Sequence, residues 1–224
     1  MKNDFLKNNI IAHRGIYDNK KVIENTINAF KKAVNKGYTI ELDLHLTKDN
    51  KVIVFHDDKL DRLTNEKGIL KDKTYEELKE IKLINGDTIP LFEDVLSLVD
   101  GKVPLLIELK DDRKDHELEK EVSKILDNYN GLFAIQSFRP STIIHFRIFR
   151  NKFIRGLLIS PKSILKYKSL RKIILCDPDF INVNKTLLNN KKIKEFDGIK
   201  LAYVVDKSEK DKYSDKCDNM ICNI

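Results

Sequence analysis

The sequence predicts an α/β fold, a closed (β/α)8 TIM barrel, in a single domain of residues 1–224. Short apolar stretches alternate with stretches of helical spacing roughly eight times, and no linker-like or low-complexity segment separates them. Strict alternation of strands and helices indicates a parallel sheet, and eight repeats favour a closed barrel over an open, doubly wound sheet.

The first part of the chain supplies two strands and a helix. NIIAHRG at residues 9–15 predicts a strand. Residues 24–36 predict a helix, because apolar side chains recur there every three or four positions. Residues 39–46 predict the second strand, because apolar and polar side chains alternate along them.

A hairpin-like excursion and an insertion follow the second strand. A turn at residues 48–50 leads into a β stretch at 52–55, which brings residue 56 back beside the second strand. Residues 58–90 lack a steady period and predict a small irregular insertion with one short helix at 75–81.

The second half of the chain repeats the alternation. PLLIELK at residues 104–110 is an apolar run typical of a buried strand. The other strands are expected at 132–138, 154–160, 180–183, 200–205 and 220–224. The helices are expected at 91–99, 115–129, 140–150, 163–172 and 185–196. No helical stretch follows the last strand, so the final helix of the barrel is expected to be missing.

Composition restricts the class of protein. Hydrophobic residues make up 41% and charged residues 34% of the chain, which is typical of a globular protein with a sizeable core. No apolar run approaches the ~18–20 residues of a membrane span, and the N-terminus lacks the features of a signal peptide. We therefore expect a cytoplasmic protein without stable membrane insertion. Three cysteines without CxxC spacing predict neither a disulfide framework nor a zinc site.

The formal net charge of +7 does not by itself indicate nucleic acid. The lysines are mixed with acidic residues along the whole chain, and no basic stripe is interleaved with aromatic residues. We expect a small anionic substrate and no nucleic-acid partner. The sequence leaves the oligomeric state open.

Glu41 and Asp43 share one face of the second strand, opposite the leucines at positions 42, 44 and 46. Like charges two residues apart on one face repel each other, so something must compensate them. In a barrel the leucines would pack on the helices, and the carboxylates would point inward near the C-terminal mouth, where barrel active sites lie.

Two more strand ends and the hairpin bring further polar side chains to this mouth. The first strand ends in His13 and Arg14, and the third carries Glu108 and Lys110 on one face. His56 returns through the hairpin. Three converging carboxylates need protons or a cation, and an all-oxygen donor set suits Mg²⁺ or Ca²⁺ and is a poor match for zinc.

These residue types together predict phosphodiester cleavage. Arg14 and Lys110 would place positive charge beside the ion, as a phosphate group requires. His13 and His56 lie on separate segments and could act as general base and general acid on opposite sides of the phosphorus.

Each signal also has a purely structural interpretation. Glu108 and Lys110 could form only an intra-strand ion pair. For His45 the more frequent role is a solvated or hydrogen-bonded structural histidine. We expect His116 on the surface of its charged helix and His145 in packing contacts.

Many ordered motifs make the chain resemble the glycerophosphodiester phosphodiesterase family. The motifs are AHRG at 12–15, IENT at 23–26 with the family's proline replaced, Glu41, Asp43, Thr47, Asp49, His56, Asp57, LDR at 60–62, Thr64, IPL at 89–91, ELK at 108–110 and QSF at 136–138. Such a series in register is far more specific than one short pattern.

The resemblance implies a barrel with an insertion after the second strand and hydrolysis of a glycerophosphodiester to sn-glycerol 3-phosphate and an alcohol. It implies the following site: His13 and His56 as acid and base, Arg14 and Lys110 on the phosphate, Glu41, Asp43 and Glu108 on one divalent cation (Mg²⁺ or Ca²⁺), and Glu24 in support. Two departures lie near the C-terminus. Tyr203 stands where the family usually has tryptophan, and ICNI replaces Thr-Asp-x-Pro, so substrate contacts on that side are expected to differ.

Other functions stay open at this point. A related barrel enzyme could release the headgroup of lysophospholipids, as a lysophospholipase D does, although no predicted helix has the clustered exposed aromatic residues this would need. A non-catalytic member of the family could bind a phosphodiester or a partner. The net charge leaves a nucleic-acid binder as a minor alternative.

Overall fold

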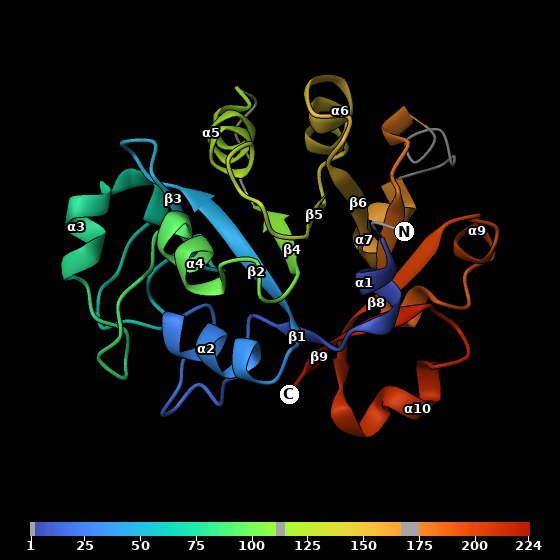
Figure 1. The fold of residues 1–224 in the computed structure, drawn as a ribbon, viewed down its shortest axis with the longest axis horizontal. Coiled ribbons are helices and arrows are strands. Elements are labelled where there is room, and N and C mark those ends of the chain that lie inside the picture. The colour runs from blue at the N-terminus through green and yellow to red at the C-terminus, as the bar shows by residue number, and fades with distance from the viewer. Residues whose placement is uncertain (1–2, 111–114, 167–174) are drawn as a thin grey trace.

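The strands of the protein close into a barrel in the computed structural model, which describes residues 3–110, 115–166 and 175–224. The parallel strands are β1 (Ile11–His13), β2 (Thr39–Leu46), β4 (Leu105–Leu109), β5 (Phe133–Ser137), β6 (Ile154–Ile159), β7 (Phe180–Asn184), β8 (Ile199–Asp206) and β9 (Asn219–Asn223). Each strand pairs with the next, and β1 pairs with both β2 and β9, which closes the ring (Figure 1). The predicted (β/α)8 barrel is confirmed.

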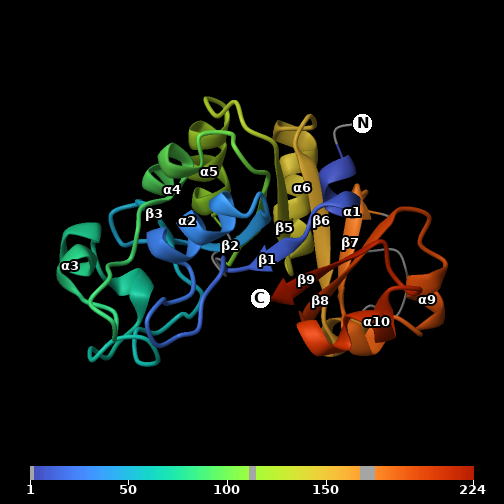
Figure 2. The ribbon, with the colours of Figure 1, turned by 60° about the horizontal axis from the view of Figure 1, so that its bottom comes forward.

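Helices surround the ring of strands (Figure 2), and the first of them packs Phe5 and Leu6 into the apolar layer inside the barrel. They are α1 (Asp4–Asn8), α2 (Ile27–Asn35), α3 (Tyr75–Glu80), α4 (Phe92–Val99), α5 (Glu117–Leu126), α6 (Pro140–Phe149), α7 (Pro161–Lys166), α9 (Lys191–Lys194) and α10 (Lys210–Tyr213), with 3-10 turns at Leu70–Asp72, Lys185–Leu187 and Lys207–Glu209. The sequence did not predict α1 and α10, because elements of five and four residues are too short to show a helical period. Within the described residues, no helix is both long and apolar enough to span a membrane.

Capping side chains explain where two predicted helices differ from the structure. The helix predicted from residue 24 begins at Ile27, because Thr26 is its N-cap and its side chain accepts a hydrogen bond from the backbone N–H of Ala29. The helix predicted at 185–196 is instead a 3-10 turn followed by α9. Asn184 and Asn190 each accept a backbone N–H two residues on and start a separate turn. Of the helix predicted at 163–172, residues 167–172 lie outside the described part.

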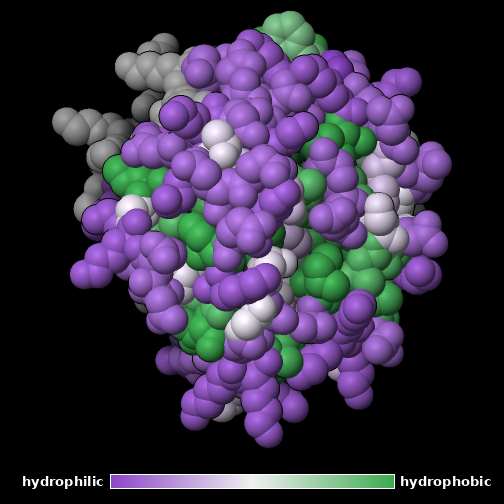
Figure 3. Space-filling model, turned by 90° about the vertical axis from the view of Figure 1, so that its left-hand side faces the viewer, coloured by the Kyte–Doolittle hydropathy of each residue, from purple (hydrophilic) through white to green (hydrophobic). Residues whose placement is uncertain are grey.

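The segment after β2 contains β3 (Val52–Val54), which pairs antiparallel to β2 and forms the predicted hairpin. Beyond it, residues 58–90 contain α3, one 3-10 turn and isolated bridges, and pack around a hydrophobic cluster that includes Ile23 and Phe55. On this side of the molecule the surface is mostly hydrophilic, and its hydrophobic side chains form separate patches (Figure 3).

The interior of the barrel changes from apolar to polar along the strands. Leu42, Leu44 and Leu46 pack outward in the cluster between the strands and the helices. Inside, an apolar layer near the N-terminal ends of the strands includes Leu106 and Phe180. Two residues further along the same strands, a polar layer follows. It contains Glu108 and Asn182, among others. Because side chains alternate with a period of two, each strand contributes to both layers from one face.

Candidate functional site

The polar layer brings together residues from strands far apart in the sequence. His13 of β1 lies directly beside Glu41 of β2 in the strand register, and Asp43 lies beside Glu108 of β4. Glu108 in turn lies beside Gln136 of β5. The three strand ends that the sequence predicted to meet therefore do meet, at the C-terminal mouth of the barrel.

The chain turns sharply at the end of β1, and this turn directs Arg14 back over the barrel. Arg14 and Gly15 both have positive φ, 55° and 85°. A Cβ on Gly15 would lie 2.9 Å from carbon atoms of Ala29 in α2, so only glycine fits this close approach. The turn also places the backbone N–H of Arg14 3.2 Å from Glu41 Oε2, to which it donates a hydrogen bond.

Glu41, Asp43 and Glu108 form a tight acidic cluster. One carboxylate oxygen from each lies within 4.8 Å of the others, and all three side chains are buried. Lys110 Nζ lies 3.3 Å from Asp43 Oδ1 and 3.0 Å from Glu108 Oε1. Arg14 Nε lies 3.1 Å from Asp43 Oδ2 as an ion pair without hydrogen-bond alignment.

The positive charges of Arg14 and Lys110 do not balance the negative charges of the three carboxylates. Burial, together with the charges of Asp43 and Glu108, raises the pKa of Glu41 well above its usual value. Burial likewise raises the pKa of Glu108 to about 7, although Lys110 opposes the shift. Burial also acts on Asp43, but Lys110 and Arg14 outweigh it and hold the pKa of that carboxyl below its usual range.

This charge imbalance fits a divalent cation. A cation among the three oxygens would favour the ionised form of all three carboxylates and so oppose the raised pKa of Glu41. The donor set contains only oxygen, which favours a hard ion such as Mg²⁺ or Ca²⁺. Asn25 donates from Nδ2 to Asp43 Oδ2 at 2.9 Å and so fixes one of these carboxylates.

His13 and His56 both line a cavity of about 160 Å³ beside the cluster. Burial and the nearby Arg14 charge lower the pKa of His13 to about 4. Burial also lowers the pKa of His56, although Asp43 opposes the shift. Both imidazoles are therefore neutral at neutral pH in the metal-free protein.

Each histidine is held through its Nδ1 atom. Nδ1 of His13 lies 2.8 Å from Asn223 Oδ1, and Nδ1 of His56 lies 2.5 Å from Asp57 Oδ1. Arg62 donates from Nε to the other oxygen of Asp57 at 2.5 Å. Because a carboxylate only accepts, His56 carries a proton on Nδ1.

Glu24 joins the two arginines beneath this site. Its carboxylate accepts hydrogen bonds from Arg14 Nη1 at 2.6 Å, Arg62 Nη2 at 2.7 Å and Asn19 Nδ2 at 2.8 Å. Burial opposes its charge, but the Arg62 hydrogen bond and the Arg14 charge outweigh burial and lower the pKa of Glu24 to about 2. Glu24 does not line the cavity, so its contact with the site is through Arg14 and Arg62.

A row of amides crosses the floor of the cavity. Asn182 donates from Nδ2 to Gln136 Oε1 at 2.9 Å, and Gln136 donates from Nε2 to Glu41 Oε1 at 3.4 Å. Asn182 Oδ1 is buried and has no hydrogen-bond partner among the described residues. An unpaired buried acceptor is costly, and because this oxygen is closed to solvent it is a cost to the fold, not a contact point for a ligand.

Aromatic side chains form the opposite wall of the cavity. Phe138 and Tyr203 meet edge to face with ring centroids 5.8 Å apart. The hydroxyl of Tyr203 donates to the backbone carbonyl of Ile159 at 3.1 Å, which holds this ring in place. Here it is part of the wall.

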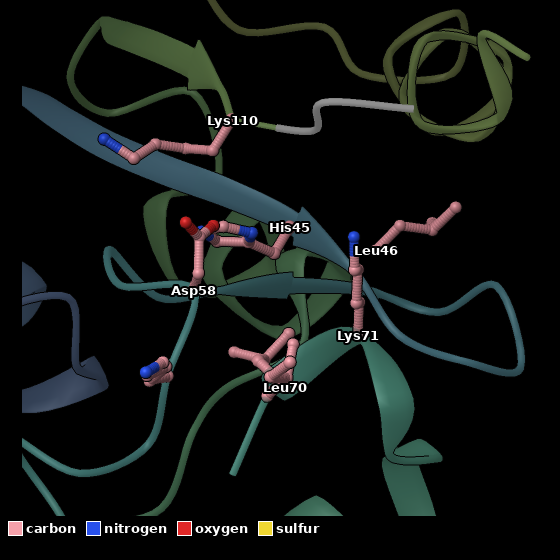
Figure 4. A pocket seen from close by; sticks show the side chains of 8 residues that line it. His45, Leu46, Asp58, Leu70, Lys71 and Lys110 are labelled. Atoms are coloured by element: carbon pink, nitrogen blue, oxygen red, sulfur yellow. The ribbon is translucent and has the colours of Figure 1, made fainter. Parts of the chain in front are cut away.

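His45 lies next to the site in a second cavity, of about 250 Å³, which it shares with Lys110 and Asp58 (Figure 4). Its side chain is buried, and its Nε2 donates to the backbone carbonyl of His56 at 3.1 Å. The expectation of a hydrogen-bonded structural histidine is confirmed.

The remaining two histidines lie in α6 and at the start of α5, away from the mouth. The rings of His116 and His145 stack with centroids 4.9 Å apart, so the packing role expected for His145 is confirmed. The side chain of His116 is 29% exposed, which agrees with the surface position expected for it. Its Nδ1 contacts the buried carboxylate of Glu119 at 3.0 Å.

Sequence reasoning did not single out Asn182 and Asn223. Both occupy inward positions of strands, two residues after the apolar residues Phe180 and Ile221. The period of two was therefore the signal that could have found them. A neutral amide does not by itself indicate a catalytic or metal-binding role as a charged residue does, and a strand of five residues, such as β9, shows its period over few positions.

Comparisons with known proteins agree on one family. The model of the glycerophosphoryl diester phosphodiesterase family matches residues 13–209. The Bacillus subtilis protein YhdW, named as a candidate glycerophosphodiester phosphodiesterase, is 34% identical over 190 residues, which is 80% of this chain and 77% of YhdW. A glycerophosphodiester phosphodiesterase of Caldanaerobacter subterraneus is 40% identical over 135 residues, which is 56% of this chain and 55% of that protein.

A solved structure gives the same fold. A phosphodiesterase from Oleispira antarctica, determined in complex with the product sn-glycerol-3-phosphate, superposes with a TM-score of 0.83 at 20% identity. The match covers 97% of this chain and 94% of that one.

Proposed function

Because the chain belongs to the glycerophosphoryl diester phosphodiesterase family, we propose that it hydrolyses glycerophosphodiesters to sn-glycerol 3-phosphate and an alcohol with one divalent cation. The observation that supports this most strongly is the cavity in which His13 and His56 flank a buried cluster of three carboxylates and two cations. A cation site beside fixed positive charges and two imidazoles is what phosphodiester hydrolysis requires.

Glu41, Asp43 and Glu108 would hold the cation, Mg²⁺ or Ca²⁺. When bound, the cation would polarise a phosphoryl oxygen and add positive charge at the phosphate. Arg14 and Lys110, which already border the carboxylates, would hold the phosphate in place by charge-assisted hydrogen bonds.

His13 and His56 would transfer protons on either side of the phosphate. Both are neutral near pH 7, so the ring that acts as base could accept a proton, and the ring that acts as acid would have to take one up before it donates to the leaving group. Asp57 would stabilise the charged form of His56 when that ring is protonated. Glu24 would position Arg14 without touching the substrate.

The glycerol moiety would occupy the cavity of about 160 Å³. Phe138 and Tyr203, which line this cavity, would pack on its carbon atoms. The product bound to the Oleispira antarctica enzyme is sn-glycerol-3-phosphate, which supports this substrate class.

The test is the release of glycerol 3-phosphate from glycerophosphocholine and glycerophosphoethanolamine. It would be run with EDTA and then with Mg²⁺ or Ca²⁺ restored, beside Glu41→Ala and, as a matched control on a solvated helix, Glu121→Ala. Turnover that the metal restores in the wild type and in Glu121→Ala, and that Glu41→Ala lacks, would support the proposal.

Two other results would replace this proposal. Turnover of lysophosphatidylcholine in preference to both glycerophosphodiesters would indicate a lysophospholipase D. Binding of glycerophosphocholine without turnover under any condition would indicate a non-catalytic role. The single-domain organisation, the cytoplasmic location and the absence of a nucleic-acid partner stay predictions.

A further inference from the structure

Asn223 of β9 makes a contact with His13 that the sequence did not suggest. The two strands are neighbours in the barrel, with Ile11 beside Ile221 and Ala12 beside Cys222, so their next inward positions come together. Asn223 Oδ1 lies 2.8 Å from His13 Nδ1. The contact links residues 210 positions apart in the sequence.

A third residue determines which way the Asn223 amide faces. Asn223 Nδ2 donates to Asp206 Oδ1 in β8 at 3.0 Å. A carboxylate only accepts hydrogen bonds, so the NH₂ group must face Asp206 and the carbonyl oxygen must face His13. The hydroxyl of Tyr17 also donates to Asn223 Oδ1, at 3.3 Å, which agrees with this orientation.

The orientation of the amide determines the tautomer of His13. An amide carbonyl oxygen has no proton to donate, so the 2.8 Å contact requires the proton on Nδ1 of the imidazole. In the neutral ring the other nitrogen, Nε2, then carries the lone pair. Among the described residues no protein group bonds to Nε2, while the ring itself borders the cavity.

We propose that Asn223, held by Asp206, is a positioning residue that keeps neutral His13 in the Nδ1–H tautomer, with Nε2 as its proton-accepting atom. This inference rests on the proposed function for its role in turnover. The tautomer follows from the hydrogen bonds alone.

The two histidines of the site are thus held by partners of different charge. His56 donates to the carboxylate of Asp57, whereas His13 donates to a neutral amide. A neutral acceptor orients an imidazole without adding a negative charge that would stabilise its protonated form. The arrangement at His13 is therefore suited to a ring that must be unprotonated at the start of the reaction.

A structural role for Asn223 is the competing explanation, because Asp206 and Asn223 also face each other in the β8–β9 ladder. The tautomeric state of the His13 ring, measured directly, separates the two explanations. The ¹⁵N NMR spectrum of histidine side chains distinguishes the two neutral tautomers, and His13→Gln would assign the His13 signals among those of the five histidines.

We expect the Nδ1–H tautomer at His13 in the wild type and a shift toward the Nε2–H tautomer in Asn223→Ala. We expect kcat of Asn223→Ala to fall about 10–100-fold with little change in KM, as when an orienting partner of a catalytic-site histidine is lost. The double variant Asp206→Asn/Asn223→Asp exchanges the amide and the carboxylate. It restores both hydrogen bonds and should restore the tautomer.

Asn219→Ala is the matched control. Asn219 lies in the same strand, and its Nδ2 donates to the backbone carbonyls of Leu6 and Asn9, away from the cavity. A loss of kcat in both alanine variants with an unchanged His13 tautomer would overturn the proposal in favour of a structural role. The proposal would also be overturned if Asn223→Ala kept the wild-type tautomer of His13, or if it kept the wild-type kcat. A wild type inactive on every diester would refute the proposed function, and the tautomer shift would still decide the Asn223 contact.

Discussion

Glu41 is buried beside Asp43 and Glu108, and burial and these two charges raise its pKa well above its usual value. Both of its carboxylate oxygens accept hydrogen bonds, one from the backbone N–H of Arg14 and one from Nε2 of Gln136. Glutamine keeps the shape of the side chain but turns an NH₂ group toward one of these donors. Glu41→Gln therefore tests the proposed cation site at a cost to the fold that can be measured separately.

We expect Glu41→Gln to lower the free energy of unfolding of the metal-free protein by about 1–3 kcal/mol, because one N–H donor loses its acceptor. The wild type should gain about 2.7 kcal/mol at a cation concentration of 100 Kd, because the ion binds only the folded state. Glu41→Gln should lose most of this gain. Urea unfolding of both proteins with EDTA and with Mg²⁺ or Ca²⁺ measures it, and an equal gain in both would exclude Glu41 as a ligand.

The pKa of Glu24 is shifted in the opposite direction to that of Glu41, because the charged form of Glu24 stabilises the fold. Its pKa is lowered from 4.5 to about 2, so the folded state holds the carboxylate more strongly than the unfolded chain does. The resulting stabilisation, on the order of 3 kcal/mol, is fully present above the unfolded pKa and is lost as pH falls toward 2.

Glu24→Gln should therefore be less stable than the wild type at pH 7, by on the order of 3 kcal/mol. The difference should narrow by about 1 kcal/mol near pH 3.5, where the unfolded wild type is already protonated. Urea unfolding at the two pH values tests this, with Glu121→Gln as a control whose carboxylate pairs with Lys124 on a helix surface. A pH-independent difference would show that packing, and not charge, is what Glu24 contributes.

At the scale of elements, the junction between β1 and α2 connects the fold to the site. Gly15 allows the chain to pass against α2 while Arg14 turns toward the carboxylates. Gly37, at the other end of α2, also has positive φ, but a Cβ there would meet nothing within 4 Å. The two glycines share a positive φ and differ in the space around them, so comparing them separates backbone strain from steric clash.

We expect Gly15→Ala to lower the free energy of unfolding by about 2–4 kcal/mol, because backbone strain and a clash with Ala29 add together. Gly37→Ala should cost only about 1 kcal/mol from backbone strain. Denaturant unfolding of both variants checks this. Equal losses would mean that α2 moves away to accommodate the extra methyl group.

For the whole molecule, β9 matters beyond its length because it closes the ring. It pairs with β8 on one side and β1 on the other, and Ile221 is buried in the apolar layer inside the barrel. Ile224, one residue beyond the strand, is 38% exposed. The last strand should thus be part of the cooperative unit even though it lies at the end of the sequence.

Ile221→Ala should lower global stability by about 2–5 kcal/mol, the usual cost of truncating a buried isoleucine. Ile224→Ala should stay within about 0.5 kcal/mol of the wild type. Hydrogen exchange in β2, on the other side of β1, should accelerate in Ile221→Ala. If the acceleration were confined to β8 and β9, the end of the barrel would be an independent unit.

The sequence by itself determined the alternation of strands and helices, the parallel barrel and the acidic strand ends. These follow from local periods: the leucines of β2 and the run PLLIELK show which face is apolar, and the opposite face then carries the carboxylates. Short helices such as α9 were misjudged, because Asn184 and Asn190 cap turns that propensity alone does not separate.

Only the tertiary structure decided which partners hold the side chains of the candidate site. Barrel closure brings Asn223 to His13, and the strand register brings Asn182 and Gln136 under Glu41. These contacts depend on strands far apart in the chain meeting in one register, which no local pattern encodes. Periodicity along the chain therefore predicts which side chains point inward. Closure of the barrel determines which of them meet.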